Sequence, residues 1–146
     1  MKVTNSKPRV VFNASVIFSS FRSSRGASRA IMTFLKQKRI NGIISETILD
    51  EALKHAPEIP MDKNSLRSQI SKLFPKVLPA PEKNIVLEYA NRMIDQGDAH
   101  LFATCQEASA THLVSLDKHH VLVMKGKIPH LRVVAPVELL KELRLS

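Results

Sequence analysis

The chain has 146 residues, of which 44% are hydrophobic and 24% charged, a composition typical of soluble globular proteins. A single cysteine, Cys105, excludes an internal disulfide and any cysteine-rich zinc module, and it fits a reducing compartment such as the cytoplasm. No apolar run approaches the roughly 20 residues of a membrane span, so we expect no membrane association. We expect a single domain over residues 1–146, with a flexible start at residues 1–8.

The positive charge is concentrated at the start of the chain. The formal net charge is +9, and residues 1–45 carry nine of the 22 bases and none of the 13 acids. The remaining bases and acids balance from Glu46 onward. A field of one sign attracts polyanions, most simply nucleic acid, although an acidic protein partner or a solubilising surface would also account for it.

Apolar runs and turn residues define the elements of the first part of the chain. Apolar residues on both sides of a polar break at 13–15 predict a buried parallel strand, and Ser28 is expected to cap the next helix. Asn41-Gly42 is a stop and turn signal. The predicted elements are therefore a strand over 9–18, a Ser- and Arg-rich loop over 21–29, a helix over 29–38 and a strand over 43–44.

Helices and short strands alternate along the rest of the chain. Ser45 is expected to cap the first of these helices, and Asp98 opens the helix before the third strand. The predicted helices cover 45–56, 62–73, 81–94, the residues after 98 and those from 136 onward, and the extended pieces cover 77–78, 112–116 and 131–134, with a short helix or turn at 118–124. This alternation predicts a three-layer α/β domain with a mostly parallel central sheet between helices.

Polar residues fall where the predicted strands end. Asn13 closes the first strand, Glu51 lies on the helix after the second, Asp98 opens the helix before the third, and Asp117 closes the third. Right-handed crossovers bring these positions to one rim of a parallel sheet. Carboxylates that converge repel one another, and Mg²⁺ or Mn²⁺ relieves that repulsion because both prefer oxygen ligands. Such a centre can activate water for phosphodiester cleavage.

Each of these residues also has a structural interpretation when it is taken alone. Asp98 is then a helix N-cap, Asp117 a turn residue, Asn13 a strand-end turn former and Glu51 part of a solvated helix face. The Ser-rich loop contains Arg22, Arg25 and Arg29. These arginines could contact phosphates, or the loop could simply be exposed to solvent, an alternative that the sequence supports nearly as well.

Four segments, in this order, resemble the PIN-domain nucleases, especially the toxin components of bacterial and archaeal toxin–antitoxin systems: VVFNASVIFSS, IISETILDEAL, GDAHLFATC and THLVSLDKHH. The resemblance implies a PIN-like three-layer fold and a Mg²⁺- or Mn²⁺-dependent endoribonuclease. It implies that the metal and catalytic positions are Asn13, Glu51, Asp98 and Asp117. Ser15 matches a position that shapes the first loop, and Ser115 one that precedes the last acid. RNA, a homodimer and a small antitoxin protein are the implied partners.

The first acidic position departs from this pattern. Family members nearly always carry Asp there, whereas this chain has Asn13. An amide offers one oxygen ligand but no negative charge, so metal binding is expected to weaken. Three interpretations remain open: a weakened ribonuclease, a catalytically degenerate protein that binds RNA or an antitoxin, or an introduced inactivating substitution.

Overall fold

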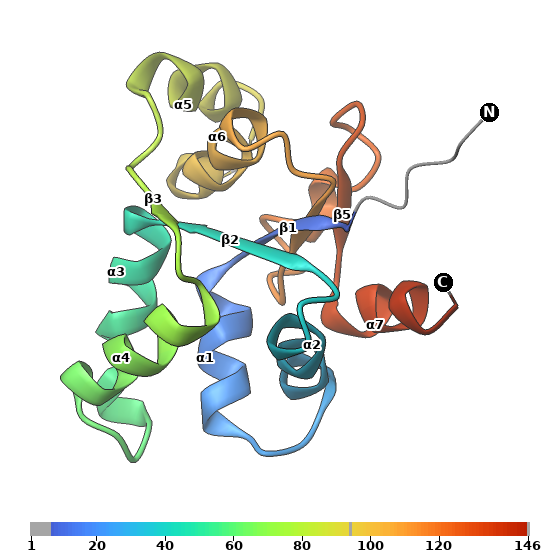
Figure 1. Cartoon of the computed structure of the whole chain (residues 1–146). Coiled ribbons are helices and arrows are strands. Elements are labelled where there is room, and N and C mark those ends of the chain that lie inside the picture. Colours follow the sequence, from blue (N-terminus) through green and yellow to red (C-terminus); the bar gives the residue numbers. More distant parts are fainter. Residues whose placement is uncertain (1–6, 94, 146) are drawn as a thin grey trace.

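The computed structural model describes residues 7–93 and 95–145, so the flexibility expected for residues 1–8 falls mostly outside the described residues. Five parallel strands form one sheet in the order β3-β2-β1-β4-β5 (Figure 1). The strands are β1 (Arg9–Phe12), β2 (Asn41–Ser45), β3 (Val77–Leu78), β4 (His112–Val114) and β5 (Arg132–Val134). The predicted parallel sheet is confirmed.

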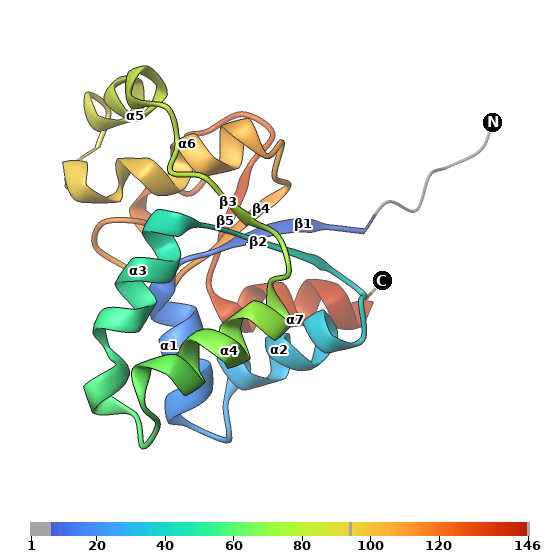
Figure 2. The ribbon, with the colours of Figure 1, turned by 60° about the vertical axis from the view of Figure 1, so that its left-hand side comes forward.

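Helices cover both faces of this sheet, as predicted for a three-layer fold. They are α1 (Ala14–Arg22), α2 (Ala27–Lys36), α3 (Glu46–Lys54), α4 (Lys63–Leu73), α5 (Lys83–Ala90), α6 (Ala99–Glu107) and α7 (Pro136–Leu145). Helices α5 and α6 lie on one face, and α1, α2, α4 and α7 lie on the other (Figure 2). The core between the layers includes Phe12, Phe74 and Phe102, all almost fully buried. In the described part of the chain, no helix has the length and apolar character needed to cross a membrane.

The predicted strand over 9–18 is wrong beyond Phe12. The chain turns at Asn13, and residues 14–22 form α1, which buries Val16 and Ile17 against the core. A short apolar run cannot be assigned to a strand or a helix by periodicity alone. The polar residues at 13–15 are therefore the entry to a helix and not a break within a strand.

The loop predicted over 21–29 is also too long. Helix α1 continues to Arg22, and α2 already begins at Ala27. The residue before α2 is Gly26, whose φ of 100° is a left-handed conformation that glycine adopts without steric cost. Ser28 is therefore not the cap but a buried residue within the first turn of α2.

Other predicted elements agree in place, and their ends shift. Ser45 caps α3, because its Oγ accepts a hydrogen bond from Ile48 N at 3.2 Å. The strand predicted over 112–116 ends two residues earlier, at Val114. The helix predicted over 81–94 is shorter, and the segment at 118–124 is a turn that leads into the 3₁₀ turn Leu122–Met124. Two further 3₁₀ turns are Ala56–Glu58 and Gln96–Asp98.

Gly42 allows α2 and α4 to approach the sheet closely. A Cβ atom at this position would lie 2.7 Å from both Leu35 Cδ1 and Phe74 Cε1. We expect Gly42→Ala to lower the free energy of unfolding by roughly 1–3 kcal/mol, the usual cost of overpacking. Urea unfolding measures this loss.

Leu35→Ala supplies the control for Gly42→Ala. If the added methyl group clashes with Leu35, the two substitutions combined will cost less than the sum of their separate effects. Additive losses would contradict a clash with this side chain.

Candidate metal centre

The carboxyl ends of β1 and β4 meet at the point where the strand order reverses, the place where open α/β sheets bind ligands. Phe12 pairs with Val114, so the next polar side chains, Asn13 and Ser115, lie side by side. Asn13 N donates to Val114 O at 3.0 Å, and Asn13 Nδ2 donates to Ser115 Oγ at 2.8 Å. The amide is buried, with an exposed fraction of 7%. The order and pairing of the strands therefore place Asn13 at the switch point.

Asp117 lies on the loop that leaves β4, and two serines fix this loop. Ser115 Oγ accepts from Asp117 N at 3.0 Å, and Ser15 Oγ accepts from Leu116 N at 3.3 Å. Asp117 Oδ1 accepts from His119 N and His120 N at 3.1 and 3.0 Å, so the turn interpretation of Asp117 holds for this oxygen. Its Oδ2 lies 3.3 Å from His120 Nδ1.

Asp98 occupies the N-cap position of α6, yet its side chain makes no capping hydrogen bond. The N-cap interpretation of this carboxyl group is therefore wrong. The preceding turn is held instead by Asp95, whose Oδ1 accepts from Gly97 N at 2.8 Å. The Asp98 carboxylate is consequently not used by its own helix.

Several carboxylates surround Asp98. Burial raises the pKa of the Asp98 carboxyl above its ordinary value, and the negative charges of Asp95, Asp117 and Glu51 raise this pKa further. The nearby His100 lowers the pKa of Asp98. The charges of Asp117 and Glu51, two of the predicted ligands, thus act on the third, Asp98, although the three residues are far apart in the sequence.

Glu51 projects from α3 toward α6 and meets His100. Glu51 Oε1 lies 2.7 Å from His100 Nε2, an ion-pair distance, although the geometry is not that of a hydrogen bond. His100 is buried, whereas the Glu51 side chain is 38% exposed. This contact holds the Glu51 carboxylate against His100.

Asp98 forms a compact group with two residues that sequence reasoning missed, whereas the predicted ligands Asp117 and Glu51 are not part of this group. The ligand atoms of Asp95, Asp98 and His120 all lie within 4.8 Å of one another, as donors around one cation would. His120 Nδ1 is also 3.9 Å from Asp95 Oδ2. The sequence signals were the DQGD turn, which places two carboxylates three residues apart, and a histidine three residues after Asp117.

The predicted phosphate-binding arginines lie away from this cluster. Helix α1 starts beside Asn13 and ends at Arg22, about 13 Å further along its axis for nine residues at 1.5 Å each. Arg25 lies in the exposed turn that follows, and Arg29 Nη1 donates to Ser20 O at 3.0 Å. Their role in binding RNA stays a prediction.

The donor set fits a divalent cation. Carboxylate oxygens of Asp98, Asp117, Glu51 and Asp95 are hard ligands of the kind that Mg²⁺ and Mn²⁺ prefer, and a His120 nitrogen suits Mn²⁺ better than Mg²⁺. A cation among these groups would relieve the repulsion that raises the pKa of Asp98.

Acidic side chains at the switch point of an all-parallel sheet lie where such folds bind their ligands, and their oxygens suit a divalent cation. Residues 9–119 match the family model described as PIN domain, which is well over half of the chain. The chain therefore belongs to the PIN-domain family, whose members are generally nucleases. The resemblance inferred from the four sequence segments is confirmed at this level.

Solved structures share the fold at low sequence identity. PAE2754 from Pyrobaculum aerophilum superposes with a TM-score of 0.65 at 19% identity, covering 95% of this chain and 97% of that one. VapBC2 from Rickettsia felis was solved bound to a DNA fragment from its promoter. It superposes with a TM-score of 0.64 at 12% identity, covering 87% of this chain and 98% of that one. No curated protein sequence matches the chain significantly.

Proposed function

We propose that the protein is a metal-dependent endoribonuclease of the PIN toxin type, weakened by Asn13. The observation that supports it most directly is the crowding of negative charge at Asp98, where Asp95, Asp117 and Glu51 all raise the pKa of one carboxyl group at the switch point of the sheet. Carboxylates that lie near one another repel, so their placement favours a role in holding a cation.

In this proposal Asp98, Asp117 and Glu51 hold Mg²⁺ or Mn²⁺, and Asn13 contributes at most one neutral oxygen ligand. Asp95 and His120 supply further donors, whose ligand atoms lie within 4.8 Å of that of Asp98. A cation held by these residues would activate a water and stabilise the leaving oxygen of a phosphodiester. Ser15 and Ser115 position the Asp117 loop through their hydrogen bonds to it.

RNA is the proposed substrate. The acid-free first part of the chain would attract its phosphates, and Arg22, Arg25 and Arg29 are the candidate contacts. The family relationship also supports a small antitoxin protein as partner, a homodimer and a cytoplasmic location.

Asn13 specifically favours a second candidate, a degenerate PIN protein that binds RNA or an antitoxin without cleaving. Its amide is buried and donates to Ser115 Oγ, so it forms a satisfied polar contact without any cation. This candidate predicts binding with a strong dependence on salt and no turnover with any metal.

A cleavage assay separates the two candidates. We expect purified protein to cleave single-stranded RNA in the presence of Mn²⁺ and to lose this activity when EDTA is added. Asp98→Asn purified in parallel controls for contaminating ribonucleases. Absence of cleavage with Mn²⁺, or cleavage that survives EDTA, would contradict the proposed enzyme.

Replacing His120 tests the additional donors. We expect His120→Ala to weaken Mn²⁺ binding by about tenfold or more, measured by isothermal titration calorimetry, because a ring nitrogen is lost from the donor set. His119→Ala is the matched control, since His119 contributes only its backbone N–H to Asp117. Equal Mn²⁺ affinities in the two variants would remove His120 from the metal centre.

A further inference from the structure

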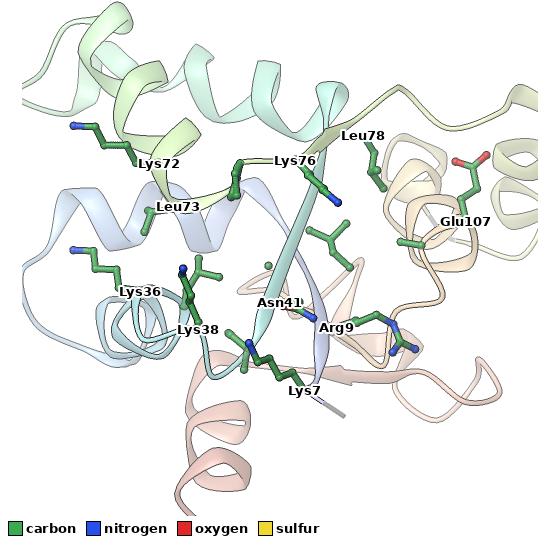
Figure 3. Close-up of a pocket in the computed structure, with 16 residues that line it drawn as sticks. Lys7, Arg9, Lys36, Lys38, Asn41, Lys72, Leu73, Lys76, Leu78 and Glu107 are labelled. Atoms are coloured by element: carbon green, nitrogen blue, oxygen red, sulfur yellow. The ribbon is translucent and has the colours of Figure 1, made fainter. Parts of the chain in front are cut away.

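A basic groove of about 770 Å³ lies where β1 and β2 begin, at the edge of the sheet opposite the metal centre (Figure 3). The ends of α2 and α4 and the chain leading into β3 complete its walls. One acidic side chain, Glu107, and six cationic side chains line it. The cationic residues are Lys7, Arg9, Lys36, Lys38, Lys72 and Lys76. We call this surface the basic groove.

The charges of the basic groove are not neutralised within the protein. Among the described residues, none of the six cations forms an ion pair, and Arg9 donates its Nε to Ser109 O at 2.7 Å. Glu107 Oε2 is engaged by Glu82 N at 3.2 Å. All five lysines are exposed. The groove therefore presents a net positive field to a ligand.

Helix ends explain only part of this charge. Lys36 and Lys72 lie in the last turns of α2 and α4, where a cation stabilises the helix dipole. Lys7 and Lys76 precede strands, where no such dipole acts. Lys38 follows α2 with a φ of 59°, a left-handed conformation that costs a non-glycine residue roughly 1 kcal/mol. Helix ends therefore account for Lys36 and Lys72 but not for Lys7 and Lys76.

The floor of the basic groove is aliphatic. Ile43, Leu73 and Leu78 are partly buried there, and Leu35 and Ile40 lie beneath them. None of the described residues that line the groove is aromatic, so nucleobases would find no stacking platform. Aliphatic side chains of a protein segment would instead bury apolar surface against this floor.

The outer edge of β2 is open beside this floor. β3 pairs only with Ile44 and Ser45, so it offers no residue opposite the first three residues of β2. Successive residues of a strand direct their backbone N–H and C=O groups to opposite sides. Asn41 N donates to Pro8 O on the β1 side, so the N–H and C=O of the next residue, Gly42, face the open side. An extended chain could hydrogen-bond there as an added strand.

We propose that the basic groove binds an extended, acidic segment of a partner protein, which lies along the open edge of β2. Its carboxylates pair with Lys38, Lys76 and their neighbours, and its alternate aliphatic side chains contact Ile43 and Leu78. The site is separate from the metal centre, which lies at the carboxyl ends of the strands. The proposal therefore does not depend on nuclease activity.

A peptide titration tests this proposal. The probe is a short fluorescein-labelled peptide in which glutamate and valine alternate, and its control carries glutamine in place of glutamate. We expect only the acidic peptide to bind the full chain, and Lys38→Glu/Lys76→Glu to weaken its binding by about tenfold or more, because two favourable contacts become repulsive. Lys83→Glu/Lys141→Glu changes the net charge equally, outside the groove, and should bind as the wild type does.

The controls decide what a loss of binding means. Equal losses in the two double variants would show nonspecific charge attraction and would overturn the proposal. The proposal would also be overturned if a uridine oligonucleotide bound through the groove lysines and the peptide did not bind. The groove would then be a nucleic-acid surface. Mn²⁺ affinity, measured in the same variants, should not change, which distinguishes this test from that of the metal centre.

Discussion

Asp98→Asn is expected to lower Mn²⁺-dependent RNA cleavage by about 10²- to 10³-fold, corresponding to the several kcal/mol that a correctly held cation contributes to the transition state. Asp98 is the carboxylate on which the other acids converge, and its own helix does not use it as a cap. An amide keeps the shape of the side chain and removes its charge. Rates measured at saturating Mn²⁺ separate lost chemistry from lost metal affinity.

The same substitution should stabilise the metal-free protein at neutral pH. The folded state raises the pKa of Asp98, first through burial and then through the acids around it, so the ionised form is disfavoured in the folded protein. The contribution of this group to stability is therefore greatest at low pH and is lost as the pH rises through the folded pKa. A neutral amide removes that loss.

Thermal unfolding in EDTA at neutral pH measures this gain. We expect a higher Tm for Asp98→Asn than for the wild type, and a smaller rise on adding Mn²⁺. Asp50→Asn is the matched control, because Asp50 is exposed on α3 and lies outside the cluster. An Asp98→Asn variant that cleaves RNA normally, or that unfolds at a lower temperature, would show that Asp98 is not the centre of a metal site.

Features that depend on local chemistry could be predicted from the sequence. Ser45 precedes an amphipathic run and caps α3 as expected, since a serine oxygen at that place satisfies a free N–H wherever the helix packs. The regular alternation of elements likewise predicted the parallel sheet. The contact between Asn13 and Ser115 follows from the pairing of β1 with β4, which the structure supplies.

Features that depend on tertiary packing could not be predicted in the same way. The run Val16–Phe18 is apolar enough for a strand, and only its packing in the folded chain makes it part of α1. His120 has no helical partner at metal-binding spacing, and it reaches Asp95 and Asp98 because the Asp117 turn directs it there. Distances across the cluster, and not spacings along the chain, identify these donors.

Asn13→Asp is the substitution expected to increase function. The new carboxylate would lie beside Ser115, where the amide Nδ2 now donates to Oγ at 2.8 Å. The hydroxyl group can adapt, because Oγ can donate its own proton to a carboxylate while it still accepts from Asp117 N. The local packing therefore tolerates the exchange, and its main effect is one added negative charge.

That charge should act in opposite directions on metal binding and on stability. We expect Mn²⁺ affinity to rise by about tenfold or more, since the charge of the ligands sets the affinity for hard cations, and cleavage to rise with it. Without metal, a buried carboxylate at a position only 7% exposed should lower the free energy of unfolding by roughly 1–3 kcal/mol.

Calorimetric titration with Mn²⁺ and urea unfolding with and without Mn²⁺ measure the two effects in one variant. Asn84→Asp adds the same charge at an exposed position in the first turn of α5, so it should leave the Mn²⁺ affinity unchanged and should not lower the stability. A gain in affinity together with a loss of metal-free stability would mean that Asn13 occupies a true ligand position and has weakened the metal centre. Unchanged affinity would mean that the cation is held without any contribution from the end of β1.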